Sequence, residues 1–138
     1  MNITKYPQYQ LYLLTLHLLM LKNQLVPENC DDRCVNATLI NRAYYSAYLY
    51  CALWLEDIKL FKPLSSWQFD ENEKSISKHK QIINALYNFN EPKMGSQLSQ
   101  LFDLRHKADY ESFIDITPDE VKDAIHHMEK IINHLKFK

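Results

Sequence analysis

The longest apolar stretch of the chain covers residues 35–55 and contains a single charged side chain, that of Arg42. Alternating spacings of four and three residues define one helical face in it, formed by Val35, Leu39, Arg42, Ser46, Leu49 and Leu53. A guanidinium buried on such a face without a partner would cost several kcal/mol. We therefore predict a polar partner for Arg42, and the segment 104–110, which contains Arg105 and Asp109, is the candidate.

Hydrophobic periodicity predicts five helices, at about 8–25, 31–57, 75–87, 96–109 and 118–135. The first helix has Leu11, Leu14, Leu18 and Leu21 on one face. Residues 58–74 form a long connection, which is the best candidate for a mobile or functional loop. Residues 88–95 are expected to be a linker.

The last helix has the clearest start in the chain. Thr117 is placed to cap it, Pro118 suits the first helical position, and Glu120 completes a capping box.

Composition also favours helices. The 138 residues include one glycine, Gly95, whereas sheets with tight turns need more residues that tolerate positive φ. We predict a single all-α domain over residues 1–138, an up-and-down bundle of about five helices whose first helix lies within residues 1–28. The formal net charge of −1 gives no general attraction to nucleic acid, so any contact with RNA has to be local.

The three cysteines are odd in number and follow no secretory signal, which indicates reduced thiols and a cytoplasmic protein. Cys30 and Cys34 are interpreted as small packing residues. No membrane contact is expected, because residues 11–25 are too short to span a bilayer and Arg42 interrupts the longer stretch. The last helix has no histidine pair at i, i+4, so no metal and no other cofactor is expected.

Arg105 and Asp109 are four residues apart on the predicted fourth helix and form a natural intrahelical pair. Two interpretations stay open. In one, an arginine grips a phosphate bidentately at a cleft or a dimer interface. In the other, a purely structural polar network fixes helix register, made of Asp109, Ser46, Tyr44, Tyr45 and Tyr110.

Three motifs resemble the successive signatures of the HEPN-domain family. They are Asn-Arg-Ala-Tyr-Tyr-Ser-Ala at 41–47, Ser-Lys-His at 77–79 and Leu-Arg-His-Lys-Ala-Asp-Tyr at 104–110. The resemblance covers about residue 31 to the C-terminal end. It implies a helical bundle that forms a homodimer, in a prokaryotic toxin–antitoxin or antiviral defence system, often beside a minimal nucleotidyltransferase.

Many HEPN proteins are metal-independent RNases in which an arginine is followed, after four to six residues, by a histidine. By this resemblance Arg105 takes the arginine position, and Tyr110 stands where histidine is expected. An unperturbed tyrosine has a pKa near 10 and is a poor base. In the catalytic version, Arg105 stabilises the phosphate charge and Tyr110 or His79 handles the proton. The residues expected to brace this site are Arg42, Tyr45, Ser46 and Asp109.

Two functions follow as hypotheses. The first is RNA or nucleotide-phosphate binding at a dimer cleft, with an endoribonuclease activity that needs no metal because the 2′-hydroxyl of RNA is the nucleophile. The second is a non-catalytic partner or regulatory subunit that docks a nucleotidyltransferase antitoxin or another defence protein. A broader option is a helical assembly protein whose exposed apolar stripe binds another chain.

Overall fold

The computed structural model of the chain describes residues 2–24, 30–63, 67–69 and 75–137. The α-helices within these residues are α1 (Pro7–Met20), α2 (Asp32–Lys59), α3 (Lys78–Asn88), α4 (Pro92–Tyr110) and α5 (Pro118–His134). Two short strands, β1 (Trp67–Phe69) and β2 (Ser75–Ser77), and the 3-10 turns η1 (Ile3–Lys5) and η2 (Lys22–Gln24) complete the described elements.

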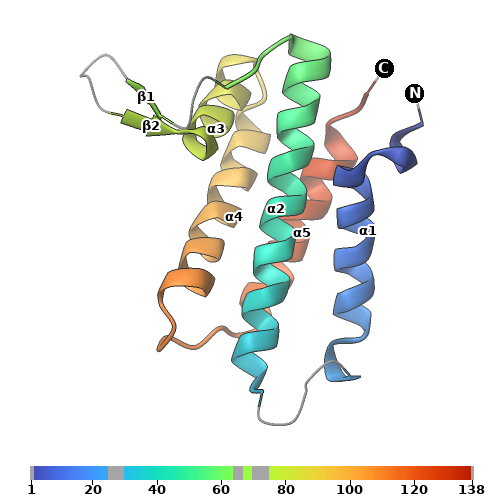
Figure 1. Cartoon of the computed structure of the whole chain (residues 1–138), viewed down its shortest axis with the longest axis vertical. Coiled ribbons are helices and arrows are strands. Elements are labelled where there is room, and N and C mark those ends of the chain that lie inside the picture. The colour runs from blue at the N-terminus through green and yellow to red at the C-terminus, as the bar shows by residue number, and fades with distance from the viewer. Residues whose placement is uncertain (1, 25–29, 64–66, 70–74, 138) are drawn as a thin grey trace.

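The helices form an up-and-down bundle with α2 as its central element (Figure 1). The helices α1, α4 and α5 all pack against α2, while the shorter α3 packs chiefly on α4. The hairpin of β1 and β2 projects from the bundle beside α3. The predicted all-α helical bundle is therefore confirmed.

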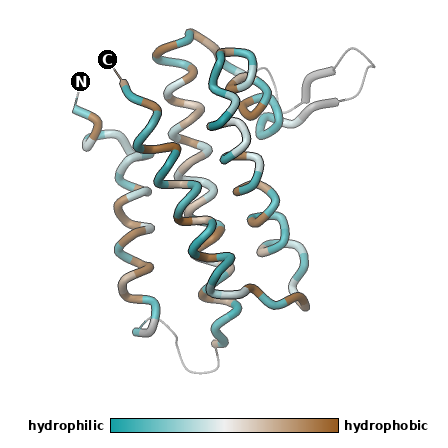
Figure 2. Tube along the Cα trace, turned by 180° about the vertical axis from the view of Figure 1, so that it is seen from behind, coloured by the Kyte–Doolittle hydropathy of each residue, from teal (hydrophilic) through white to brown (hydrophobic). Residues whose placement is uncertain are grey.

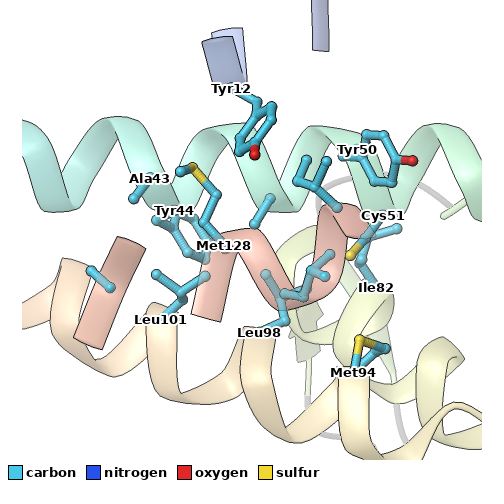
Figure 3. Close-up of a cluster of buried hydrophobic side chains, with 14 of the residues drawn as sticks. Tyr12, Ala43, Tyr44, Tyr50, Cys51, Ile82, Met94, Leu98, Leu101 and Met128 are labelled. Atoms are coloured by element: carbon cyan, nitrogen blue, oxygen red, sulfur yellow. The ribbon is translucent and has the colours of Figure 1, made fainter. Parts of the chain in front are cut away.

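The core lies where α2, α3, α4 and α5 meet, as Figure 3 shows. Its members include Tyr44 of α2, Ile82 of α3, Leu98 and Leu101 of α4 and Met128 of α5, each of them 0% exposed. Full burial of one such side chain contributes about 1.5–3 kcal/mol. These contacts fix α2 against α4, the two helices that carry the candidate site.

The start of α5 confirms the predicted capping box. Oγ1 of Thr117 accepts a hydrogen bond from the backbone N–H of Glu120 at 3.2 Å, and Oε1 of Glu120 accepts one from the N–H of Thr117 at 3.1 Å. Asp31 caps α2 similarly, since its Oδ1 accepts from the N–H of Cys34 at 2.9 Å. The N-terminal ends of α2 and α5 are therefore both fixed by hydrogen bonds between residues close in sequence.

The predicted linker at 88–95 is wrong in its second half, because α4 begins at Pro92 and includes Gly95. Proline suits the first turn of a helix, where its missing N–H leaves no bond unmade. Gly95 allows the close approach of a ring, since a Cβ built on it would lie 2.7 Å from Cε2 of Tyr87. The chain reverses between α3 and α4 at Asn90, whose φ is 65°.

The predicted connection at 58–74 is only partly correct. The helix α2 continues to Lys59, and Leu60 ends it in the left-handed conformation with φ at 55°. Residues 67–69 then pair antiparallel with residues 75–77. Aromatic and β-branched residue types favour strands, which a search for helical periodicity does not detect. Residues 64–66 and 70–74 of this segment lie outside the described part.

Two predicted apolar stripes are turned partly away from the core. On α1 the buried residues are Tyr12 and Thr15, while Leu14 is 51% exposed. On α2 the stripe is buried at Leu39 but 38% exposed at Leu49. Both segments are apolar on several faces, so periodicity alone does not select the face that meets the neighbouring helices.

The interpretation of Cys30 and Cys34 as packing residues is also wrong. Cys30 is half-buried and Cys34 is exposed, whereas Cys51 is buried in the core. Burial along α2 begins only at Asn36, so the first turn of the helix is peripheral. All three cysteines are free thiols.

Candidate functional site

Arg105 lies on α4 and connects it to α2. Its side chain is 13% exposed, and its Nε donates to Oδ2 of Asp109 at 2.9 Å, one helical turn further on. Its Nη2 donates to the hydroxyl of Tyr45 on α2 at 3.2 Å. The pairing of Arg105 with Asp109 that the spacing predicted is present, and Tyr45 belongs to the same network.

Three tyrosine rings surround the Arg105 guanidinium. Its Cζ lies 5.6 Å from the ring centroid of Tyr44, 5.4 Å from that of Tyr45 and 5.5 Å from that of Tyr110. A cation is attracted to an aromatic face at such distances. Burial lowers the pKa of Arg105, but Tyr45 and the carboxylate of Asp109 outweigh it and the pKa is raised. The guanidinium therefore stays charged, and a carboxylate in direct contact compensates its charge.

Arg42 lies on α2 and reaches Asp109 only through Asn41. The Nε of Arg42 donates to Oδ1 of Asn41 at 3.0 Å, and its Nη2 donates to the same oxygen. The Nδ2 of Asn41 donates in turn to the two carboxylate oxygens of Asp109, at 3.0 and 3.3 Å. The partner predicted for Arg42 is therefore a neutral amide, and the segment 104–110 lies one hydrogen bond further on.

A groove with a volume of about 520 Å³ opens beside Arg42. This size falls within the range of roughly 300–1,000 Å³ that is usual for small-molecule sites. The start of α2 and the end of α4 form its walls, and the lining includes Asp31, Arg33, Thr38, Arg42, Asp109 and Ser112.

The acids of the groove are engaged by donors, whereas its arginines meet neutral acceptors. Asp31 caps α2, and Asp109 accepts from Arg105 and from the amide of Asn41. Arg33 donates to the backbone carbonyls of Glu111 and Ile114, at 2.8 Å each. In the described part of the chain, neither Arg33 nor Arg42 forms an ion pair.

His79 opens α3 and lies against the tyrosines of α2. Its Nδ1 shares a hydrogen bond with the hydroxyl of Tyr44, and its ring stacks on Tyr48 with the centroids 4.5 Å apart. Burial, together with the positive charge of Arg105, lowers the pKa of His79. Burial also raises the pKa of the Tyr44 hydroxyl. Tyr44 therefore contacts His79 through its hydroxyl and Arg105 through its ring.

Of the expected site residues, one has no hydrogen bond to this network and another lies at its edge. Ser46 is 0% exposed, and its Oγ has no hydrogen-bond partner among the described residues. Tyr110 is 64% exposed and lies at the edge of the site, with its ring 5.0 Å from that of His106. The expected residues that the structure does bring together are Arg42, Tyr45, His79, Arg105 and Asp109, with the ring of Tyr110 beside Arg105.

The described residues contain no group of three or more histidine, cysteine or acidic side chains that could hold a metal ion. None of the helices found there has the length and apolar character needed to cross a membrane.

The family model described as HEPN domain matches residues 67–138, the segment that contains β1, β2, α3, α4 and α5. His79, Arg105 and Asp109 lie inside this segment, whereas Asn41 and Arg42 precede it on α2. The comparison with curated proteins found no match, and neither did the comparison with solved structures.

Proposed function

Since the chain belongs to the HEPN domain family, we propose that it binds the phosphate groups of RNA or of a nucleotide in the groove beside Arg42. One observation carries the proposal. The guanidinium of Arg42 borders the groove, and the side chain of Asn41 accepts both of its hydrogen bonds within the described structure. Asn41 occupies one edge of the guanidinium, and the opposite edge keeps N–H groups that match two phosphate oxygens.

The local charge supports this proposal. Arg105 compensates the carboxylate of Asp109, so that Arg33 and Arg42 outweigh Asp31 in the groove. A chain with a formal net charge of −1 has no general attraction to phosphate, and a local excess of positive charge is what it needs.

Endoribonuclease activity is the more specific form of the proposal. Here Arg105 stabilises the negative charge that develops on the phosphate. His79 accepts the proton of the 2′-hydroxyl, since its lowered pKa keeps it neutral at pH 7 and its hydrogen bond to Tyr44 fixes the ring. Tyr110 lies at the exposed edge of this site, with its ring against the guanidinium of Arg105. In this version the 2′-oxygen bonds to phosphorus as the bond from phosphorus to the 5′-oxygen breaks, which leaves a 2′,3′-cyclic phosphate. The 5′-oxygen that leaves takes a proton from water, and the step needs no metal.

We place this activity in a homodimer, with two copies of the groove meeting at the dimer interface. The biological setting that we propose is a prokaryotic toxin–antitoxin or antiviral defence system, with a nucleotidyltransferase or another defence protein as partner. The motifs at 41–47, 77–79 and 104–110 support this proposal, because together they resemble the HEPN proteins that act in such systems.

A non-catalytic subunit that docks a nucleotidyltransferase or another defence protein is the second candidate. The hydrogen bonds of Arg105 favour this second candidate. The guanidinium donates to Asp109 and Tyr45, and no histidine is hydrogen-bonded to Arg105 in the described structure. In this version the network only joins α2 to α4.

An RNA-binding assay separates the two candidates. The full chain is titrated into a labelled single-stranded RNA of about 12 nucleotides, a length in the range that such sites bind. We expect Arg42→Gln to weaken binding roughly tenfold, because it removes one charge-assisted phosphate contact. The matched control is Lys122→Gln, which removes the same charge from an exposed position of α5. Equal losses in both variants, or no RNA binding by the unmodified chain, would favour the second candidate.

Cleavage needs its own measurement. The unmodified chain is incubated with RNA in the presence of a metal chelator, and we expect cleavage that Arg105→Ala abolishes. Cleavage that persists in Arg105→Ala would remove this residue from the catalytic step.

A further inference from the structure

The turn after α4 exposes one aromatic side chain completely. Phe113 is 103% exposed, and the nearby Tyr110 and Ile114 are 64% and 49% exposed. Figure 2 shows hydrophobic (brown) stretches in the connection between α4 and α5, at one end of the bundle. Burial of a phenylalanine ring is strongly favourable, so the contacts of a single chain do not explain a phenylalanine at this position.

This turn is nevertheless held in place. The backbone N–H of Ile114 donates to the carbonyl of Glu111 at 3.0 Å and closes the turn. Arg33 donates to the carbonyls of the same two residues, at 2.8 Å each, and anchors both ends of the turn to α2. A defined backbone therefore presents Phe113 to solvent, and a ligand would not have to order a loose loop in order to contact it.

The ring of Tyr110 is also held. The guanidinium of Arg105 lies 5.5 Å from its centroid, and the ring of His106 lies 5.0 Å away. Ser112, between Tyr110 and Phe113 in the sequence, lines the groove beside Arg42. The two exposed aromatic residues therefore directly follow Asp109 and Ser112, which line a groove whose Arg42 has no ion pair among the described residues.

We propose that Tyr110 and Phe113 form a base-stacking subsite for single-stranded RNA, whose backbone phosphate lies at Arg42. The inference rests on the proposed phosphate-binding function and adds to it the form of the ligand. An unpaired base offers a free π face to an aromatic ring, whereas a duplex covers these faces with neighbouring base pairs. A mononucleotide or inorganic phosphate would occupy the groove without using both rings.

The charges around the turn favour an uncharged base at the rings. Glu111 and Asp115 are exposed on either side of Phe113 and would repel a phosphate there. The attraction for phosphate lies instead in the groove, at Arg33 and Arg42. This separation of an aromatic edge from a cationic groove matches a nucleotide chain, in which neutral bases alternate with charged phosphates.

The test measures binding of the full chain to labelled single-stranded oligouridine RNA of about 12 nucleotides, with duplex RNA and inorganic phosphate as competitors. We expect Phe113→Ala and Phe113→Leu to weaken single-strand binding about tenfold and Phe113→Trp to retain it, because stacking requires an aromatic ring. Met20→Ala is the matched control, since Met20 is an 81% exposed apolar residue at the end of α1. Duplex and phosphate should compete weakly, and their competition should not change in the Phe113 variants.

The outcomes distinguish this inference from the proposed function. If the chain binds single-stranded RNA and Phe113→Ala binds it equally well, the stacking subsite is wrong and the phosphate-binding function stands. If the unmodified chain binds no single-stranded RNA, the stacking subsite is wrong, and if it binds no inorganic phosphate either, the phosphate-binding function is wrong as well. If Phe113→Leu keeps full affinity, or if Phe113→Ala converts a dimer to a monomer in sedimentation, the turn is an apolar contact between chains and the inference is overturned.

Discussion

Asn41 donates its side-chain amide to the carboxylate of Asp109 at 3.0 Å, across 68 residues of chain. This bond gives Asp109 two neighbours, the amide of Asn41 and the guanidinium of Arg105. It also keeps Arg42 two hydrogen bonds away from the carboxylate, so that the charge of Arg42 is not compensated by direct contact. Arg105 is therefore ion-paired and Arg42 is not, and the amide of Asn41 accounts for this difference.

Asp109→Asn should strengthen the binding of RNA. The change removes a negative charge from the groove wall and keeps the shape of the side chain. Removal of a unit charge a few ångströms from the phosphate changes the binding free energy by about 1 kcal/mol in water. We therefore expect the affinity for RNA to rise roughly fivefold at low salt, and this gain to shrink as salt is added. Asp123→Asn, at an exposed position of α5, is the control in the same titration. Unchanged or lower affinity would contradict phosphate binding in this groove.

Mild acid should destabilise the fold. The pKa values of His79 and His127 are both lowered, chiefly by burial. A lowered pKa means that the folded chain binds the proton less tightly than the unfolded chain, in which histidine titrates near 6.5. The stabilising contribution of each histidine is therefore full above about pH 6.5 and is lost as the pH falls through this value toward the folded-state pKa.

Urea unfolding at a series of pH values between roughly 5 and 8 measures this dependence. His127→Gln should reduce the slope of the unfolding free energy, because one of the two groups is removed. His17→Gln, at an exposed position of α1, should leave the slope unchanged. A free energy of unfolding that is flat or rises on acidification would contradict the assignment.

Leu60→Gly should stabilise the protein. Leu60 ends α2 with φ at 55° and is 89% exposed, so it is strained and buries little apolar surface. The left-handed conformation costs a non-glycine residue roughly 1–2 kcal/mol. Glycine avoids this cost, but its greater conformational entropy in the unfolded chain offsets roughly 0.5–1 kcal/mol of the gain. We expect a net gain of about 0.5–1 kcal/mol in urea unfolding. Asn90→Gly should gain less, since asparagine tolerates positive φ.

Gly95 and Tyr87 should be energetically coupled. Alanine is favoured over glycine inside a helix by about 1 kcal/mol, but its Cβ would lie 2.7 Å from Cε2 of Tyr87. Gly95→Ala should therefore stabilise α4 in a Tyr87→Ala background and lose that gain where Tyr87 is present. A double-mutant cycle by thermal unfolding measures the difference. Equal effects in the two backgrounds would show that the ring moves aside without cost.

The parts of the fold that depend on short-range signals could be predicted from the sequence. The cap of α5 depends on Thr117 and Glu120, three residues apart, and both of its hydrogen bonds are present. The face of α2 that is buried could not be predicted in the same way. Leu49 fits a helical stripe as well as Leu39 does, yet it is 38% exposed, because the positions of α1, α4 and α5 decide which side of α2 meets the core.

The contacts of the candidate site also divide into those that the sequence predicts and those that it does not. The pair of Arg105 and Asp109 follows from their spacing along one helix, and the structure contains it. The bond between Asn41 and Asp109 and the anchoring of the turn after α4 by Arg33 join positions far apart in the chain. The spacing of residues along one helix therefore does not predict these contacts. Asn41 lies directly before Arg42 in the motif at 41–47, but the sequence does not indicate which side chain it bonds.

The helix α2 places the site and the core on neighbouring residues. Asn41 and Arg42 face the groove, Ala43 and Tyr44 are 0% exposed, and Tyr45 binds Arg105. An inserted residue in this turn would rotate all later side chains by about 100°, which would move the core face and the groove face together. The ligand of this protein can therefore change by substitutions on α2, whereas an insertion or deletion within this helix would disturb the core and the groove together.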